Sequence, residues 1–372
     1  MRHLILVLFL SALSFQATIA SRPGSASPGD STQIDIEDFV SQHTEGQWFL
    51  AYRIGDMDGE TLNQFTLKRG YITFKNDFTE NLSVRFTQDI TLDEEGSDKG
   101  NIEMRLKYCY LNYELDDFML FTKPTIEAGL VHRPWLDFEQ KINPYRVQGK
   151  MFLERAGLMN SADFGLMFSS LLGGEMDESY QKRVNSKYPG RYGSLSVGVY
   201  NGGGYHALER NTSKNIEGRL TLRPFPGSFP GLQFTYNMAY GKGNTPESPD
   251  FILNSGFASY DNSFMTLALQ YYKAKGNSSG SYADELGQAY ENSGYSVFGE
   301  YEITATPLKI FGRYDQFQAP EMGPSDHQRI IAGVAYNFYK KNMLIVDLDA
   351  FDRKRDGTFD QRIWEAAIEI RF

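Results

Sequence analysis

About sixteen segments of this 372-residue chain alternate apolar and polar residues, and turn-forming residues separate them. In the segment at 231–241 one parity carries only large apolar side chains: Leu232, Phe234, Tyr236, Met238 and Tyr240. Successive side chains of a strand point to opposite faces, so the pattern predicts strands with one apolar and one polar face. Tilted strands of ~10 residues cross a membrane, and an even number of them brings both termini to one side.

The sequence therefore predicts an all-β fold: a transmembrane antiparallel β-barrel of about sixteen strands. A large soluble β-sandwich or propeller is the alternative, because soluble sheets also alternate. The predicted strands span 48–55, 63–75, 80–91, 102–115, 125–133, 162–172, 192–202, 215–224, 231–241, 250–260, 263–274, 294–303, 307–317, 329–339, 343–352 and 361–372.

The composition favours the membrane barrel. The mean hydropathy is -0.44, yet the chain contains 23 Tyr, 27 Phe and 35 Gly residues. Only alternate residues of each barrel strand are apolar, so such a protein is polar on average. Cys109 is the single cysteine, so no disulfide forms within the chain. The net charge of -10 argues against nucleic acid as a partner.

The N-terminus predicts export. Residues 1–20 have a charged start, an apolar run too short to span a bilayer, and small residues before Ser21, which is the pattern of a signal peptide. Residues 21–46 are interpreted as a periplasmic lead-in and 47–372 as the barrel. The predicted location is the bacterial outer membrane.

The connections predict a loop inside the barrel. Counted from a periplasmic first strand, connections at the inner end are short, except 173–191, and those at the outer end are longer. The third outer connection, 134–160, is the longest, and it contains enough aromatic and aliphatic residues to pack against a wall. We expect it to fold into the lumen and narrow the channel of a sixteen-stranded barrel.

Charged residues of this loop and of the polar strand faces are the candidate site, since fixed charges in a narrow opening set the selectivity of a pore. The candidate constriction residues are Arg133, Asp137, Glu139, Lys141, Arg146, Lys150, Glu154 and Arg155. The candidate basic residues of the lumen wall are Arg85, Arg105, Lys107, Arg219, Arg223 and Arg313. The last strands present acidic residues to the lumen, which predicts opposed basic and acidic walls.

Three stretches resemble the phosphate-selective porin O and P family. They are "YRVQGKMFLERAGLMNSADFGLMFSSLLGG", "GSLSVGVYNGGGY" and "NIEGRLTLRPFPGSFPGLQF", and the resemblance covers about 125–241. It implies a sixteen-stranded outer-membrane porin, usually a homotrimer, with its third loop in the pore. Members of the family select phosphate through an arginine ladder and a lysine cluster, which cannot be matched residue by residue in this chain.

The predicted function is a porin: a water-filled channel for passive diffusion of small hydrophilic solutes, including anions such as phosphate. The alternative is a non-conducting outer-membrane barrel that acts as an adhesin, receptor or structural protein. We expect no enzyme activity, cofactor or metal, since no nucleophile motif or metal-ligand spacing occurs. The expected partners are outer-membrane lipid, the solutes, two further copies of the chain and the barrel assembly machinery, with the terminal Phe372 as an assembly signal.

Overall fold

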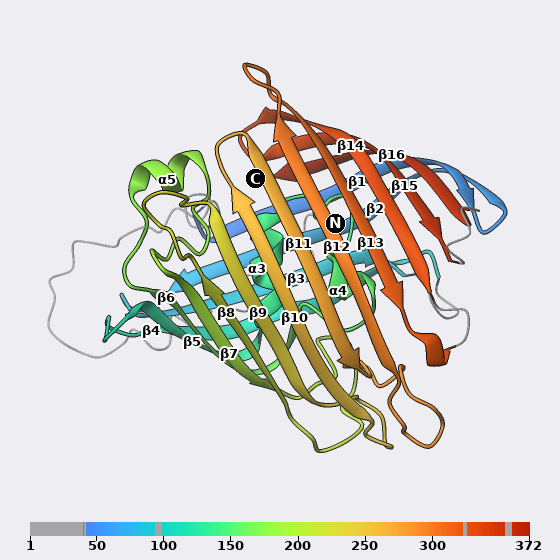
Figure 1. Cartoon of the computed structure of the whole chain (residues 1–372), viewed down its shortest axis with the longest axis horizontal. Helices are drawn as coiled ribbons and strands as arrows, with labels where there is room; N and C mark the ends of the chain where they lie inside the picture. Colours follow the sequence, from blue (N-terminus) through green and yellow to red (C-terminus); the bar gives the residue numbers. More distant parts are fainter. Residues whose placement is uncertain (1–39, 41, 94–98, 323–325, 354–358) are drawn as a thin grey trace, which may run out of the picture. The chain divides into compact units, whose positions relative to one another are not determined.

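The computed structural model describes residues 40, 42–93, 99–322, 326–353 and 359–372. The predicted signal peptide, 1–20, lies outside the described residues, as does most of the lead-in, 21–46. Within the described residues, sixteen strands form one closed antiparallel barrel (Figure 1). Each strand pairs with its neighbours along the chain, and the last pairs with the first. This confirms the predicted fold class. No helix among the described residues is long and apolar enough to cross a membrane.

Predicted and observed strands correspond one to one and differ only at their ends. The strands are β1 (Thr44–Met57), β2 (Glu60–Asp77), β3 (Leu82–Leu92), β4 (Ile102–Glu114), β5 (Phe121–His132), β6 (Ala162–Leu172), β7 (Gly193–Tyr200), β8 (Asn215–Leu222), β9 (Leu232–Lys242), β10 (Asp250–Asp261), β11 (Met265–Lys275), β12 (Glu291–Glu302), β13 (Leu308–Gln318), β14 (His327–Tyr339), β15 (Asn342–Asp352) and β16 (Gln361–Arg371). The helical segments are α3 (Pro134–Ile142), α4 (Phe152–Arg155), α5 (Glu178–Arg183) and the 3-10 turn η1 (Pro320–Met322). The first strand begins at Thr44, before the predicted barrel boundary at 47.

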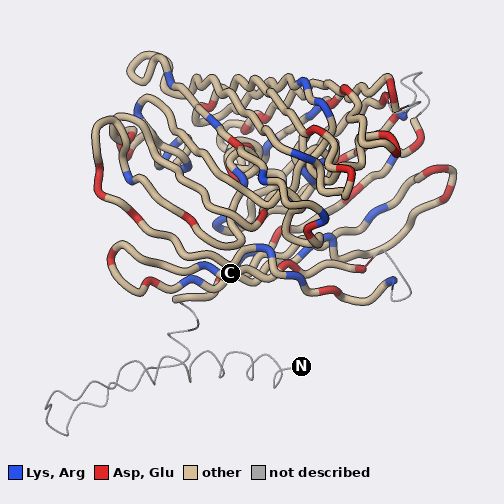
Figure 2. Tube along the Cα trace, turned by 90° about the horizontal axis from the view of Figure 1, so that it is seen from below, with Lys and Arg blue, Asp and Glu red and all other residues tan. Residues whose placement is uncertain are grey.

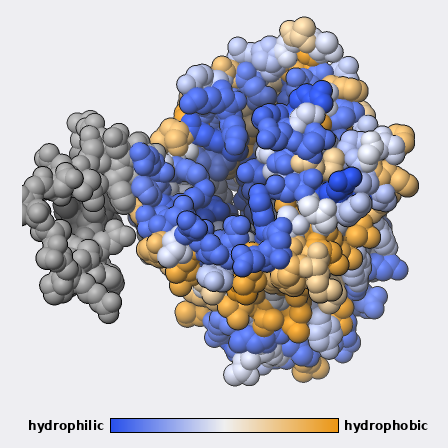
Figure 3. Space-filling view, turned by 90° about the vertical axis from the view of Figure 1, so that its left-hand side faces the viewer, coloured by the Kyte–Doolittle hydropathy of each residue, from blue (hydrophilic) through white to orange (hydrophobic). Residues whose placement is uncertain are grey.

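The two faces of the strands have the predicted orientation. Along β9, Phe234, Tyr236 and Tyr240 are exposed on the outside, while the intervening Thr235 and Asn237 are buried on the inside. A strand with an apolar outer face and a polar inner face suits a barrel that has lipid outside and water inside. Figure 3 shows hydrophilic residues gathered around a hollow at one end of the barrel.

The last strand closes the barrel. Gln47 of β1 lies opposite Arg371 of β16. The backbones of Gly46 and Phe372 exchange two hydrogen bonds of 2.9 and 3.1 Å. The Phe372 ring occupies the space above Gly46, where a Cβ atom would approach it to 2.3 Å. Among the described residues, closure leaves no unpaired strand edge.

Within the part of the chain that the structure describes, four strand pairs contain a register shift, and those of β1–β2 and β3–β4 change the inward-facing residues. Phe49 lies opposite Arg69 and Leu50 opposite Leu67, so Lys68 has no partner residue on β1. Likewise, Thr87 lies opposite Tyr108 and Gln88 opposite Leu106, so Lys107 is unpaired on β3. An extra residue of this kind is a β-bulge, and it re-aims the side chains around it. Both bulged residues are lysines that make contacts inside the barrel.

The long connection 173–192 contains α5 rather than additional strands, so the strand count of sixteen is unaffected. Asp177 accepts a hydrogen bond of 2.8 Å from the Tyr180 backbone N–H and caps the start of α5. Beyond the helix, the connection turns back to the third loop through Asn185 and Tyr188. Its length therefore serves contacts with the third loop.

Candidate functional site

The third loop, 133–161, packs against one side of the barrel interior. Its aromatic residues pack against those of the wall: Trp135 meets Phe257 of β10 edge to face with ring centroids 5.1 Å apart, and Phe152 meets Tyr272 of β11 at a tilt, with centroids 5.6 Å apart. The Tyr145 ring lies parallel to Phe311 of β13, with centroids 4.0 Å apart. Because these contacts bury the apolar face of the loop on β10–β13, the remaining space lies along its opposite, polar edge.

Two other connections hold the loop at its ends. From the outer connection 276–290, Tyr282 donates a 2.6 Å hydrogen bond to the Ala156 carbonyl, and Asn277 donates one of 2.9 Å to Gly157. From 173–192, Asn185 donates to the Lys141 carbonyl at 3.3 Å, and the Tyr188 hydroxyl donates to Asp137. These hydrogen bonds satisfy the backbone carbonyls of Ala156, Gly157 and Lys141 inside the barrel, which favours one fixed position of the third loop.

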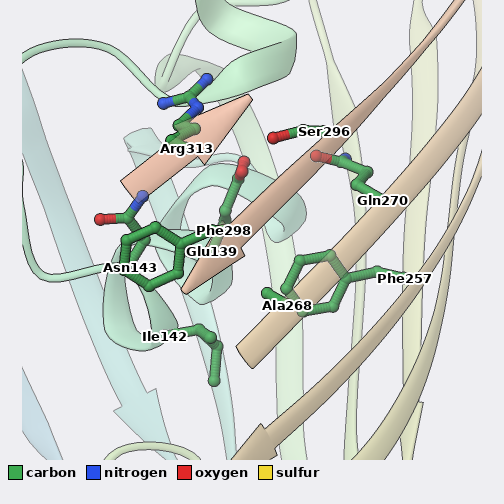
Figure 4. Close-up of a pocket in the computed structure, with 9 residues that line it drawn as sticks. All are labelled: Glu139, Ile142, Asn143, Phe257, Ala268, Gln270, Ser296, Phe298 and Arg313. Atoms are coloured by element: carbon green, nitrogen blue, oxygen red, sulfur yellow. The ribbon is translucent and has the colours of Figure 1, made fainter. Parts of the chain in front are cut away.

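A small cavity of about 10 Å³ remains between α3 and the wall, just enough for one water molecule. Figure 4 shows Glu139 reaching from α3 among side chains of β10–β13, including Phe298 and Arg313. Burial raises the pKa of Glu139 to about 7, although Arg313 opposes this shift. Glu139 therefore belongs to the contact between the loop and the wall, and it is separated from the open lumen.

The polar edge of the loop borders a cavity of about 240 Å³. We call this cavity, with the adjoining inner surface of β2–β4, the passage. The loop contributes Gln148, Lys150 and Arg155, and β14–β16, β1 and β2 contribute the remaining lining residues, namely Arg53, Lys68, Arg329, Asp347, Asp349, Ile363 and Glu365. Basic and acidic residues are interspersed in the middle of the barrel (Figure 2).

The charges of the cavity are arranged in two layers. Lys68 and Arg53 both pair with Glu365, and their side chains are 19% and 28% exposed whereas Glu365 is 5% exposed. Asp347 is fully buried. Arg155 and Arg329 both form ion pairs with Asp349. The three side chains are similarly exposed, so two cations face the cavity beside one carboxylate. The groups that a solute meets are therefore mainly cationic, while most of the carboxylates lie behind them.

The inner surface of β2–β4 repeats this arrangement. Asp89 is fully buried and pairs with Arg69 at 3.4 Å and with Arg105 at 3.5 Å, and these two side chains are 18% and 22% exposed. Lys150 connects the two regions, because the charges of Arg69 and Arg155 both act on it. Cations thus line the passage from β4 to β14.

The predicted constriction residues divide into three groups. Arg146, Lys150 and Arg155 lie along the edge that borders the passage, and Glu154 is buried behind Arg146. Asp137 and Lys141, one turn apart on α3, form an ion pair, and Asp137 also accepts a hydrogen bond from Tyr188. Arg133 and Glu139 differ from the prediction, because both are buried in packing contacts.

Arg133 instead anchors the base of the loop. It is fully buried, and its Nε donates to Glu217 of β8 at 2.8 Å. Arg155, by contrast, borders the cavity with 16% of its side chain exposed, and its partial burial together with Arg329 and Arg313 lowers the pKa of Arg155 to about 10. Arg155 therefore remains charged at neutral pH.

The predicted basic residues of the lumen wall fall into two groups. Arg85, Arg105 and Lys107 lie on the β3–β4 side of the lumen, as expected from their parity. Arg219, Arg223 and Arg313 differ, because they are buried where the third loop and the 173–192 connection cover the wall. Arg219, for example, lies between the rings of Phe138 and Tyr188, 4.5 and 4.6 Å from their centroids. The predicted acidic wall is also corrected, since exposed cations cover most of its carboxylates.

Sequence reasoning missed three residues of the passage: Lys68, Arg69 and Tyr205. Strict alternation allows only one of the first two to face inward, and the bulge at Lys68 admits both. Tyr205 lies in the outer connection 201–214 and reaches Asp89 inside the barrel. In the run "YNGGGY", the three glycines are the one available sequence signal of a close approach.

The comparisons with known proteins agree on the fold. No protein-family model matches the chain, and no curated protein matches it in sequence. The architecture described above is that of outer-membrane porins. OmpF of Salmonella typhi in complex with daunomycin is similar, with a TM-score of 0.60 and 15% identity over 88% of this chain and 97% of that one.

Two further structures are similar over 88% of this chain and 98% of their own. An anion-selective porin from Comamonas acidovorans has a TM-score of 0.59 and 13% identity. In-vitro folded OmpT of Vibrio cholerae in its trimer form has a TM-score of 0.55 and 12% identity. The barrel thus resembles outer-membrane proteins, which is consistent with a location in the bacterial outer membrane.

Proposed function

We propose that the chain forms a water-filled channel in the bacterial outer membrane, through which small hydrophilic solutes diffuse and anions pass more readily than cations. The observation that carries this proposal is the layering of charge, because Arg53, Lys68, Arg69 and Arg105 face the passage and carboxylates lie behind them. Fixed cations at a narrow, low-dielectric opening raise the local concentration of anions. Phosphate is one oxyanion that such a surface would accept.

The proposal is tested by adding the purified, folded protein to a planar lipid bilayer. Stepwise increases in current are expected, one for each channel that inserts. A folded protein that inserts without any current step would contradict the proposal. Purified protein heated until unfolded serves as the control for detergent artefacts.

The second candidate is a non-conducting barrel that acts as an adhesin, receptor or structural protein. The observation in its favour is that three other connections hold or adjoin the third loop: 173–192, 201–214 and 276–290. Replacing Tyr282 and Asn277 by alanine would loosen the outer end of the loop. If the barrel is plugged, conductance should appear only in this variant, whereas a porin conducts in both forms.

We propose no enzyme activity. His132 and Glu127 form a hydrogen-bonded pair at 2.9 Å, like the base and orienting acid of a hydrolase. However, Nε2 of His132 faces the Arg85 guanidinium at 3.1 Å, so a cation occupies the place of a hydroxyl nucleophile. We also propose a homotrimer, supported by the likeness to the trimer form of OmpT from Vibrio cholerae.

We propose that Phe372 is a signal for the barrel assembly machinery. Deleting Phe372 is expected to lower the amount of folded barrel in the outer membrane several-fold, because it removes the terminal aromatic and the two hydrogen bonds to Gly46. Heat-modifiable mobility on gels of outer-membrane fractions measures this amount. Phe372→Tyr, which keeps the aromatic ring and the backbone, is the matched control. Wild-type levels of the deletion variant would refute the role.

A further inference from the structure

A second outer connection enters the lumen beside the third loop. The run from Gly202 to Gly204 turns sharply, with φ of +115° and +85° at its first and last glycine. The Gly202 N–H donates to buried Asp163 at 2.8 Å. A Cβ atom on Gly204 would lie 2.2 Å from the Asn160 side chain, at the end of the third loop. Only glycine fits such a close, positive-φ turn, and the turn carries Tyr205 inward.

Tyr205 covers the cationic surface of β2–β4. Its hydroxyl donates to Asp89 at 3.1 Å and lies 3.5 Å from Nη1 of Arg69. The Arg105 guanidinium and the Lys107 ammonium lie 6.0 and 5.7 Å from its ring centroid. Lys107 also contacts the Tyr71 ring at 4.6 Å, and only 4% of it is exposed. The ring of Tyr108 lies 5.7 Å from the same ammonium, so three tyrosine rings screen Lys107, and that of Tyr205 is the one supplied by an outer connection.

We infer that Tyr205 is a specificity-determining residue of the channel, which limits the size of permeating anions and the number of cations that they meet. The inference rests on the proposed function. It adds the outer connection 201–214 to the third loop as a part of the chain that determines which anions pass. The ring narrows the passage where it contacts Arg105. It also holds Lys107 in cation–π contact, so that this charge is masked from solutes.

The hydroxyl fixes the position of the ring. Burial, followed by the charge of Asp89, raises the pKa of Tyr205, so the phenol stays protonated and can donate to the carboxylate. Asp89 thereby holds three groups: Arg69, Arg105 and Tyr205. Neutralising Asp89 would disturb all of them, so Tyr205 itself is the informative position for substitution.

The test compares Tyr205→Ala and Tyr205→Phe with wild type in planar bilayers. Tyr205→Ala removes the ring and uncovers Lys107, so we expect higher single-channel conductance and a reversal potential shifted further toward anion selectivity. The permeability of gluconate relative to chloride should also rise, because the passage is wider. Tyr205→Phe keeps the ring but loses the hydroxyl that fixes its position, so its conductance should lie between those of wild type and Tyr205→Ala. Leu208→Ala, in the same connection and 86% exposed in wild type, is the matched control.

The outcomes separate this inference from the proposed function. A wild-type channel that prefers anions, with Tyr205→Ala unchanged in conductance, reversal potential and gluconate permeability, would overturn the role of Tyr205 alone. A wild-type channel without anion preference would overturn the proposed selectivity, while a wider Tyr205→Ala channel would still support the size limit. Far-ultraviolet circular dichroism and heat-modifiable mobility verify that each variant has folded.

Discussion

Replacing Arg53, Lys68 and Arg155 together by glutamine is expected to reverse the ion selectivity of the channel. The 240 Å³ cavity would then keep two cationic side chains, Lys150 and Arg329, against three carboxylates, Asp347, Asp349 and Glu365, and Glu365 would lose both cations that now pair with it. A surface that attracts anions would become one that attracts cations. The measurement is the sign of the reversal potential in a KCl gradient.

Salt concentration provides an internal check of this result. Electrostatic interactions reach ~10 Å at 0.1 M salt and only ~3 Å at 1 M. The difference between wild type and the triple variant should therefore shrink as KCl is raised. Glutamine at Lys123, Lys182 and Lys214, which do not line the cavity, is the control that removes equal charge. A triple variant that retains the wild-type sign would show that the layered charges do not set selectivity.

Glu217→Ala is expected to lower the free energy of unfolding by about 3–5 kcal/mol, because it leaves the buried charge of Arg133 unpaired. Both side chains are essentially inaccessible to solvent, so water cannot replace the lost carboxylate. Arg133 directly precedes α3, and the third loop should therefore become less firmly anchored. Urea unfolding in lipid vesicles, followed by tryptophan fluorescence, measures the loss.

A double variant separates the loss of the pair from damage to packing. Arg133→Met with Glu217→Leu replaces both charges by apolar groups of similar size, and such replacements are often neutral or stabilising. We expect it to recover most of the stability lost in Glu217→Ala. A loss below about 1 kcal/mol in Glu217→Ala, typical of a solvent-exposed ion pair, would contradict the anchoring role.

The strands and the position of the third loop could be predicted because both depend on local patterns. Alternation fixed the outward face of β9, and the length and aromatic content of 134–160 indicated a loop packed in the lumen. The sequence could not show which charges remain accessible. That depends on pairs between strands distant in sequence, such as Lys68 with Glu365 or Arg69 with Asp89.

The bulge at Lys68 limited the prediction further. Strict alternation breaks there, and nothing in the local composition marks this position. The burial of Arg133 and Arg219 depends equally on tertiary packing, since each meets residues more than 80 positions away. The charged residues on one face of a strand therefore indicate that this face lines the lumen. The register of the closed barrel decides which of these charges face the passage.

The reversal potential of the wild-type channel tests the central claim most directly. With KCl ten times more concentrated on one side of the bilayer, the sign of the zero-current potential reports whether chloride or potassium crosses more readily. The layering of Lys68, Arg53, Arg69 and Arg105 over their carboxylates predicts the sign for chloride. A potential with the sign for potassium, from a folded channel with clear conductance steps, would contradict the account.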